Sequence, residues 1–158
     1  MRLASYTVER TLPATPERVY RALTVPADLA AWAWGTYGND VRAEADAVVG
    51  GAFEITTDAE GLGWGTRRAG MRGVYLDLRP GARVAHTLHW DAPVGYNEPG
   101  QDPLDEAYVF DLVPDGAGCR MRFSHLGIPD DGISAKEHER SMRLCFDVLA
   151  RHLEAHPA

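Results

Sequence analysis

The chain has 158 residues, of which 45% are apolar and 25% are charged, as is typical of one soluble globular domain. We therefore predict a single domain that spans residues 1–158. The formal net charge of −7 provides no basic surface to neutralise phosphates, which excludes nucleic acid as a partner. The first residues contain no long apolar run, so we expect neither a secretory signal nor a membrane span, and we predict a cytoplasmic location.

The first predicted element is a strand at residues 5–12, where apolar and polar side chains alternate. This alternation places Tyr6, Val8 and Leu12 on the inward face, with Arg10 on the same side.

Two short helices are predicted next. Thr15 is a suitable cap for a helix that begins at Pro16 and continues through residues 17–23. Pro26 interrupts it, and a second helix is predicted at residues 27–32. Helices this short suit a lid or buttress beside the core.

Strand patterns then recur through the middle of the chain, separated by loops rich in glycine and proline at residues 58–68 and 91–105. The predicted strands are 41–46, 52–57, 70–78, 82–90, 106–113 and 119–127. In the last two, which form a hairpin, Asp111 faces outward and can pair with an arginine across the strands. The inward face of this hairpin comprises Tyr108, Phe110, Leu112, Met121, Phe123 and His125.

A long helix is predicted at residues 134–155, opened by a capping box between Ser134 and Glu137. Apolar side chains recur every three or four residues along it, so one face requires a large apolar partner surface. That face comprises His138, Met142, Cys145, Phe146, Leu149 and Leu153. Consecutive strands, two short helices and one long terminal helix predict an α+β fold in which a twisted antiparallel sheet wraps around the last helix.

Ordered motifs along almost the whole chain resemble the SRPBCC (START/Bet v 1-like) superfamily, and within it the group similar to the C-terminal domain of the heat-shock protein 90 ATPase activator. The motifs are Arg10 with residues 14–24, residues 29–32, 50–53, Gly73-Val74 with Pro80, residues 110–114, 118–121, Ser124-His125, and Leu149 with residues 152–154. The resemblance implies a helix-grip fold with a cavity between the sheet and the last helix. It also implies that Arg10 is a paired, half-buried structural charge.

Members of this superfamily include lipid and hormone carriers, polyketide cyclases and co-chaperones, so the fold does not fix the function. Many relatives have Gly-Trp early in the last helix, where this chain has Ser141-Met142. The shorter, more flexible side chain at Met142 would leave room for a guest.

We predict that the cavity binds a small apolar or aromatic ligand. Its predicted lining is Trp34, Phe53, Tyr75, His86, Phe110, Phe123, His125, His138, Met142 and Phe146. Four aromatic side chains in or beside loops are either core or rim residues or line its mouth, where a ring with one polar edge can orient a guest. They are Trp34, Tyr37, Trp64 and Tyr96.

His125 and His138 flank the connection into the last helix and fall on predicted inward faces. They are either hydrogen-bonded structural histidines, a polar end of the cavity, or an acid–base pair. Three functions stay open at this point: a non-catalytic binding protein, a cyclase- or hydratase-like enzyme that uses one of these histidines, and a protein-interaction module with a chaperone or homodimer partner. The loops at 58–68 and 91–105 are where a partner surface is expected.

Metal and cofactor chemistry is not predicted. His86 and His89 are three apart in a strand and therefore point to opposite faces. Cys119 and Cys145 are too few for a disulfide scaffold or a thiolate zinc site, so we expect both to be small buried core residues.

Overall fold

The computed structural model describes residues 2–60, 68–91 and 106–158. Within these residues a seven-stranded antiparallel sheet has the strand order β1-β7-β6-β5-β4-β3-β2. The strands are β1 (Leu3–Leu12), β2 (Arg42–Ala45), β3 (Ala52–Asp58), β4 (Arg68–Arg79), β5 (Arg83–Asp91), β6 (Glu106–Asp115) and β7 (Gly118–Pro129). The helices are α1 (Pro16–Ala22), α2 (Pro26–Trp32), the 3₁₀-helix η1 (Gly35–Tyr37) and α3 (Ser134–Ala155).

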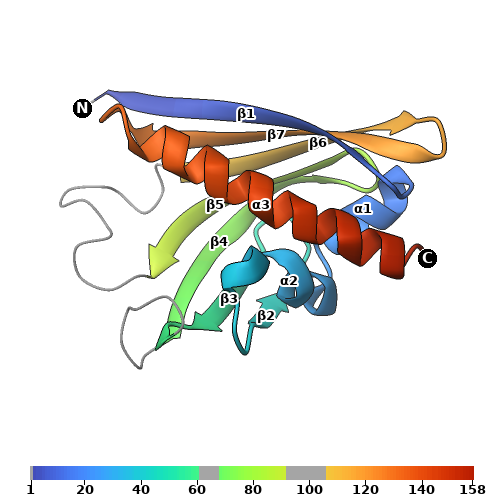
Figure 1. Cartoon of the computed structure of the whole chain (residues 1–158), viewed down its shortest axis with the longest axis horizontal. Helices are drawn as coiled ribbons and strands as arrows, with labels where there is room; N and C mark the ends of the chain where they lie inside the picture. Colours follow the sequence, from blue (N-terminus) through green and yellow to red (C-terminus); the bar gives the residue numbers. More distant parts are fainter. Residues whose placement is uncertain (1, 61–67, 92–105) are drawn as a thin grey trace.

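Helix α3 lies across one face of the curved sheet, and α1 and α2 lie beside its C-terminal part (Figure 1). The first strand pairs with the last, since β1 is hydrogen-bonded to β7 along its whole length. This arrangement confirms the predicted α+β helix-grip fold.

The inward-facing side chains of the β6–β7 hairpin are buried and form part of the apolar inner face of the sheet. Phe110 lies opposite Phe123, and both are buried, as are the other four residues predicted for the inward side. Outward-facing Asp111 does pair with an arginine, but its partner is Arg83 on β5, at 2.7 Å, and not an arginine of β7. The strand alternation therefore determined that Asp111 faces outward, while the order of strands in the sheet determined which arginine it pairs with.

The amphipathic face of α3 packs on this inner face of the sheet. Its five buried residues are Met142, Cys145, Phe146, Leu149 and Leu153. Cys119 and Cys145 are both free and buried, as predicted. Arg10 reaches α3 from β1 and forms an ion pair with Asp147, with 30% of the arginine side chain exposed, which agrees with the half-buried pair that the resemblance implies.

The predicted capping box at the start of α3 is wrong. Asp131 caps this helix: its carboxylate accepts the backbone N–H of Ile133 at 2.8 Å and that of Ser134 at 2.7 Å. The Ser134 hydroxyl donates to the same carboxylate, so it does not cap the N–H of Glu137. A carboxylate in the preceding turn is the better acceptor because it is charged. These hydrogen bonds, first that of the Ser134 side chain, lower the pKa of Asp131 to about 2.

The first short helix begins as predicted, and the second begins one residue earlier than predicted. Thr15 caps α1 by accepting the N–H of Arg18 at 3.2 Å, and Pro16 is its first residue. Pro26 starts α2, and the indole N–H of Trp32 donates to the carbonyl of Ala22 at 2.8 Å, which ties the two helices together.

A half-buried ionic cluster, which we call the clasp, fastens these helices to the end of α3. Its members are Arg18, Asp28 and His152. Arg18 donates two hydrogen bonds to Asp28, at 2.8 and 3.1 Å, and one to the carbonyl of His156 at 2.9 Å. His152 Nε2 lies 2.6 Å from the same carboxylate. Burial by itself would raise the pKa of Asp28, but the hydrogen bonds from Arg18 and His152 outweigh it and hold the pKa below its usual range.

Candidate functional site

Two hollows lie between the sheet and α3. The inner void has a volume of about 30 Å³, comparable to the space of one water molecule. Its lining includes Phe53, Tyr75, His86, Phe110 and Met142. The larger hollow, which we call the pocket, has a volume of about 190 Å³ and lies beneath the first three turns of α3. The pocket is lined by Ala33, Trp34, Tyr37, Met71, Trp90, Tyr108, His138, Ser141, Met142 and Cys145.

Helix periodicity brings four pocket residues together on α3. His138, Ser141, Met142 and Cys145 follow the spacing i, i+3, i+4, i+7, which places them along one side of a helix. Met142 and Cys145 are buried, whereas Ser141 and Tyr37 are exposed, so the pocket reaches the surface between η1 and α3. The sheet provides the floor through β4, β5 and β6.

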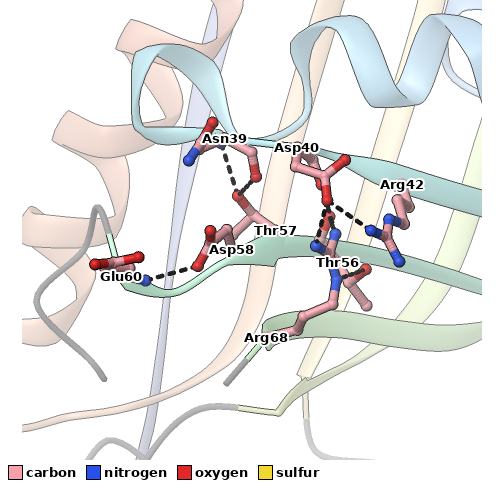
Figure 2. A network of polar contacts seen from close by, with 8 residues as sticks. All are labelled: Asn39, Asp40, Arg42, Thr56, Thr57, Asp58, Glu60 and Arg68. Carbon is pink, nitrogen blue, oxygen red and sulfur yellow. Dashed lines mark hydrogen bonds and ion pairs between the residues drawn. The ribbon is translucent and has the colours of Figure 1, made fainter. Parts of the chain in front are cut away.

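The wall formed by η1 is fixed by a polar network at the start of β2 and the end of β3 (Figure 2). The buried Thr57 hydroxyl bonds both the N–H of Asn39, at 2.9 Å, and the carbonyl of Asn39, at 3.0 Å. Arg68 of β4 contacts the carboxylate of Asp40 at 3.0 Å and the hydroxyl of Thr56 at 3.0 Å. Because Asn39 and Asp40 follow η1 after Gly38 alone, this network anchors the wall that carries Trp34 and Tyr37.

Beyond the pocket the interior is packed with aromatic rings. Phe146 has its ring centroid 5.1 Å from that of Phe123 and 6.1 Å from that of Trp32. The rings of Phe110 and Phe123 lie 4.9 Å apart. Phe123 and Phe146 line neither hollow, and both are 0% exposed. The space beneath the second half of α3 is therefore solid core.

His125 is a structural histidine by its contacts. Its Nε2 lies 2.8 Å from Glu106 Oε1 and its Nδ1 lies 3.2 Å from the hydroxyl of Tyr6, and the ring is 0% exposed. Burial lowers the pKa of His125 to about 3, so the ring is neutral. All three groups are satisfied when Nε2–H donates to Glu106 and Nδ1 accepts the Tyr6 O–H. Neither nitrogen is left for a guest.

His138 is placed differently, although it lies beside His125. Its ring lies 5.0 Å from that of His125 and 5.9 Å from that of Trp90, and it lines the pocket. Burial, and then the nearby His125, lower the pKa of His138 to about 4, so this ring is also neutral. Within the described part of the chain neither of its nitrogens forms a hydrogen bond, and the residue is half-buried. His138 is therefore a polar group open to the pocket.

Tyr108 provides a second polar group. Its ring packs edge-on against His125 at 4.7 Å, and its hydroxyl donates to the sulfur of Met142 at 3.8 Å. A thioether is a weak acceptor, so this donor is only partly satisfied. Burial raises the pKa of Tyr108 well above its ordinary value, which keeps the hydroxyl protonated.

A family model for Activator of Hsp90 ATPase homolog 1-like proteins matches residues 13–154. The chain belongs to this family. The match confirms the resemblance that the sequence motifs indicated. No curated protein matches the chain.

Solved structures support the same fold. The protein CV1439 from Chromobacterium violaceum is 27% identical, with a TM-score of 0.73 over 94% of this chain and 96% of its own. MLL2253 from Mesorhizobium loti is 20% identical, with a TM-score of 0.74 over 98% of this chain and 100% of its own. An AHSA1-like protein from Aeromonas hydrophila is 15% identical, with a TM-score of 0.68 over 96% of this chain and 93% of its own. The last two likenesses concern the fold alone.

In this member of the Activator of Hsp90 ATPase homolog 1-like family, the predicted lining residues divide into three groups. Trp34, His138 and Met142 line the pocket. Phe53, Tyr75, His86 and Phe110 line the inner void instead. Phe123, His125 and Phe146 belong to the core and line neither. Of the aromatic residues expected at the mouth, Tyr37 lines the pocket, while Trp64 and Tyr96 lie outside the described residues.

Sequence reasoning missed several pocket residues. Ala33, Met71, Trp90 and Tyr108 come from other elements, and their shared site was not visible along the chain. Ser141 and Cys145 could have been found from the helical spacing around His138. Ser141 and Met142, which stand where many relatives have Gly-Trp, both line the pocket.

A third hollow, of about 410 Å³, lies on the outer face of the sheet. Its charged side chains include Glu44, Glu54 and Arg72, all exposed. Arg72 pairs with Asp91 at 2.9 Å. Solvated charges make this surface a poor enclosure for an apolar guest.

Residues 2–60, 68–91 and 106–158 contain no group of three or more histidine, cysteine or acidic side chains suited to a metal ion. Of the helices in these residues, none has both the length and the apolar character that a membrane span requires.

Proposed function

We propose that this protein binds a small, largely apolar molecule in the pocket beneath the first turns of α3, without catalysing a reaction. The observation that carries the proposal is the 190 Å³ volume, enclosed mainly by apolar and aromatic side chains and reaching the surface between η1 and α3. An apolar cavity of about 150 Å³ is enough to bind benzene in another protein, so a guest of one or two rings fits here. Each Å² of apolar contact contributes about 25 cal/mol.

Filling the pocket tests the proposal. Met142→Trp places a larger ring in the space between α3 and Tyr108, and we expect it to abolish binding of an apolar fluorescent probe. Leu144→Trp is the matched control, because Leu144 lies on the same helix but is 38% exposed and does not line the pocket. Probe binding that survives in Met142→Trp, with the fold intact by circular dichroism, would contradict the proposed site.

Native mass spectrometry of freshly purified protein would identify a natural guest. We expect an additional mass that is lost on mild activation and absent from Met142→Trp. Identifying this mass would reveal the natural ligand, so no probe has to be chosen beforehand.

A catalytic function is the second candidate, favoured by one observation: His138 is neutral and lines the pocket without a hydrogen-bond partner among the described residues. A cyclase- or hydratase-like reaction would use it to move a proton on the guest. His125 is not suited to this role because Tyr6 and Glu106 occupy both of its nitrogens. His138→Ala would then abolish turnover of a polyketide-like substrate while leaving both its binding and the stability of the protein largely unchanged.

A chaperone partner is the remaining alternative, motivated by the name of the family and by an exposed apolar surface. Val48 and Val49 are 56% and 64% exposed, and their turn is hydrogen-bonded to β4, where Leu76 is 54% exposed. Most of the loops in which such a surface was predicted, 61–67 and 92–105, lie outside the described residues. A pull-down with Hsp90 that recovers nothing, or that Val49→Asp does not weaken, would count against this function.

A further inference from the structure

We infer that the pocket is selective for an uncharged planar ring compound with a single hydroxyl group, and that His138 and Tyr108 together recognise this hydroxyl. The inference rests on the proposed binding function and adds the chemical class of the ligand.

The aromatic walls favour a flat guest. The rings of Trp34 and Trp90 meet edge-on, with centroids 6.0 Å apart, and the ring of Trp90 lies at a shallow angle of 32° to that of His138. Rings in such arrangements interact best with another ring that is stacked or edge-on. A flat aromatic guest therefore uses these walls better than a flexible chain does.

The polar groups favour one hydroxyl. Tyr108 offers an O–H whose present acceptor is the sulfur of Met142, and the neutral ring of His138 offers one N–H and one acceptor nitrogen. A phenolic hydroxyl both accepts and donates, so it can accept from Tyr108 and donate to His138. An apolar guest without this group would leave His138 without a partner and Tyr108 with only the weak sulfur acceptor, which disfavours it.

The charges around the pocket disfavour an anion. No arginine or lysine is among the described residues that line it. The charged groups that act on His138 are the carboxylates of Glu106 and Asp131, and the whole chain carries a formal net charge of −7. A ligand carboxylate would lose its hydration without gaining a counter-charge.

A series of three probes of one size tests this selectivity: naphthalene, 2-naphthol and 2-naphthoate. Binding is followed in ¹H–¹⁵N spectra of the full chain through the indole N–H signals of Trp34 and Trp90, which line the pocket. We expect 2-naphthol to bind about tenfold more tightly than naphthalene, the effect of roughly one net hydrogen bond. We expect 2-naphthoate to bind at least about a hundredfold more weakly than 2-naphthol because its charge is desolvated without a partner.

His138→Phe keeps a ring of similar shape and removes both nitrogens. We expect it to reduce the preference for 2-naphthol over naphthalene to less than about twofold while naphthalene still binds. The matched control is His89→Phe on the outer face of the sheet, which should leave the tenfold preference unchanged.

The outcomes separate the two proposals. If naphthalene binds but 2-naphthol is no tighter, or 2-naphthoate binds as well, the inferred ligand class is wrong and the binding function stands. If His138→Phe retains the full preference, the role of His138 is wrong. If none of the three probes shifts the indole signals, the binding function and the inference both fail.

Discussion

The two halves of α3 rest on the same sheet but meet it differently. In residues 146–155, which we call the packed segment, Phe146, Leu149 and Leu153 are 0% exposed, and the ring of Phe146 packs against Phe123 of the sheet and Trp32 of α2. Residues 134–145, the pocket segment, leave 190 Å³ between the helix and the sheet. The difference follows from side-chain shape: the packed segment has a phenylalanine where the helix meets β6 and β7, and the pocket segment has Ser141 and a flexible methionine. One amphipathic helix can thus stabilise the fold with one end and leave space for a guest at the other.

The largest expected effect comes from truncating the packed segment. Phe146→Ala should lower the free energy of unfolding by about 4 kcal/mol, because it removes a fully buried ring and leaves a cavity. Met142→Ala in the pocket segment should cost only about 1–2 kcal/mol, because this side chain already borders empty space. Urea unfolding of both variants measures the difference. Equal losses would mean that the two segments are packed alike.

The clasp gives the next largest effect. Arg18→Ala should cost about 3 kcal/mol, because it leaves the half-buried carboxylate of Asp28 without its bidentate partner. The control is Arg143→Ala in the pocket segment, whose pair with Glu139 is largely exposed and is worth no more than about 0.5 kcal/mol. Thermal unfolding compares them; a similar loss in both variants would show that the clasp does not fasten the packed segment.

Acid should weaken the protein through the buried His86 and His125 and the half-buried His138. The pKa values of His86, His125 and His138 are lowered, to about 4, 3 and 4, in each case mainly by burial. Below the ordinary value of about 6.5 the unfolded chain binds protons that the folded chain does not, so stability falls as the pH decreases toward the folded values. Each histidine contributes a slope of up to about 1.4 kcal/mol per pH unit in this window.

Urea unfolding at pH 7, 6 and 5 measures this slope. His138→Phe should reduce it, because it removes one of the three titrating groups from the pocket segment. The exposed His156 is the control, and His156→Gln should leave the slope unchanged. A stability that is constant from pH 7 to 5 would contradict the burial of these rings.

The smallest effect concerns the first turn of α3. Asp131→Ala should lower the melting temperature slightly, because the N–H groups of Ile133 and Ser134 lose their acceptor, whereas Glu137→Ala should have no effect. Differential scanning calorimetry distinguishes the two variants. A larger decrease in melting temperature for Glu137→Ala than for Asp131→Ala would support the capping box that the sequence predicted.

Individual elements show how far the sequence alone could lead. The face of the β6–β7 hairpin was predictable from its alternation, since a strand with one dry face must place Phe110 and Phe123 on the same side. The two short helices were predictable from Thr15, Pro16 and Pro26, whose effects are local. The cap of α3 was not, because Asp131 and Ser134 are both good caps and only the path of the chain chooses between them.

The candidate site was predictable in part. Helical spacing placed His138 and Met142 on the inward face of the last helix, the family resemblance implied a cavity there, and both residues line the pocket. Phe123 and Phe146 look the same in the sequence, yet they fill the interior and line neither hollow. His125 was also indistinguishable from His138 until the contacts with Tyr6 and Glu106 were known.

The sequence by itself determined the fold class, the inward faces and the family, because periodicity, turn residues and ordered motifs are properties of the chain. Tertiary structure decided where the space lies and which histidine faces it. Both depend on how side chains from α3, η1 and three strands fill a shared volume. A void is a difference between the volume enclosed by the backbone and the volume of the side chains within it, and no single segment contains that information.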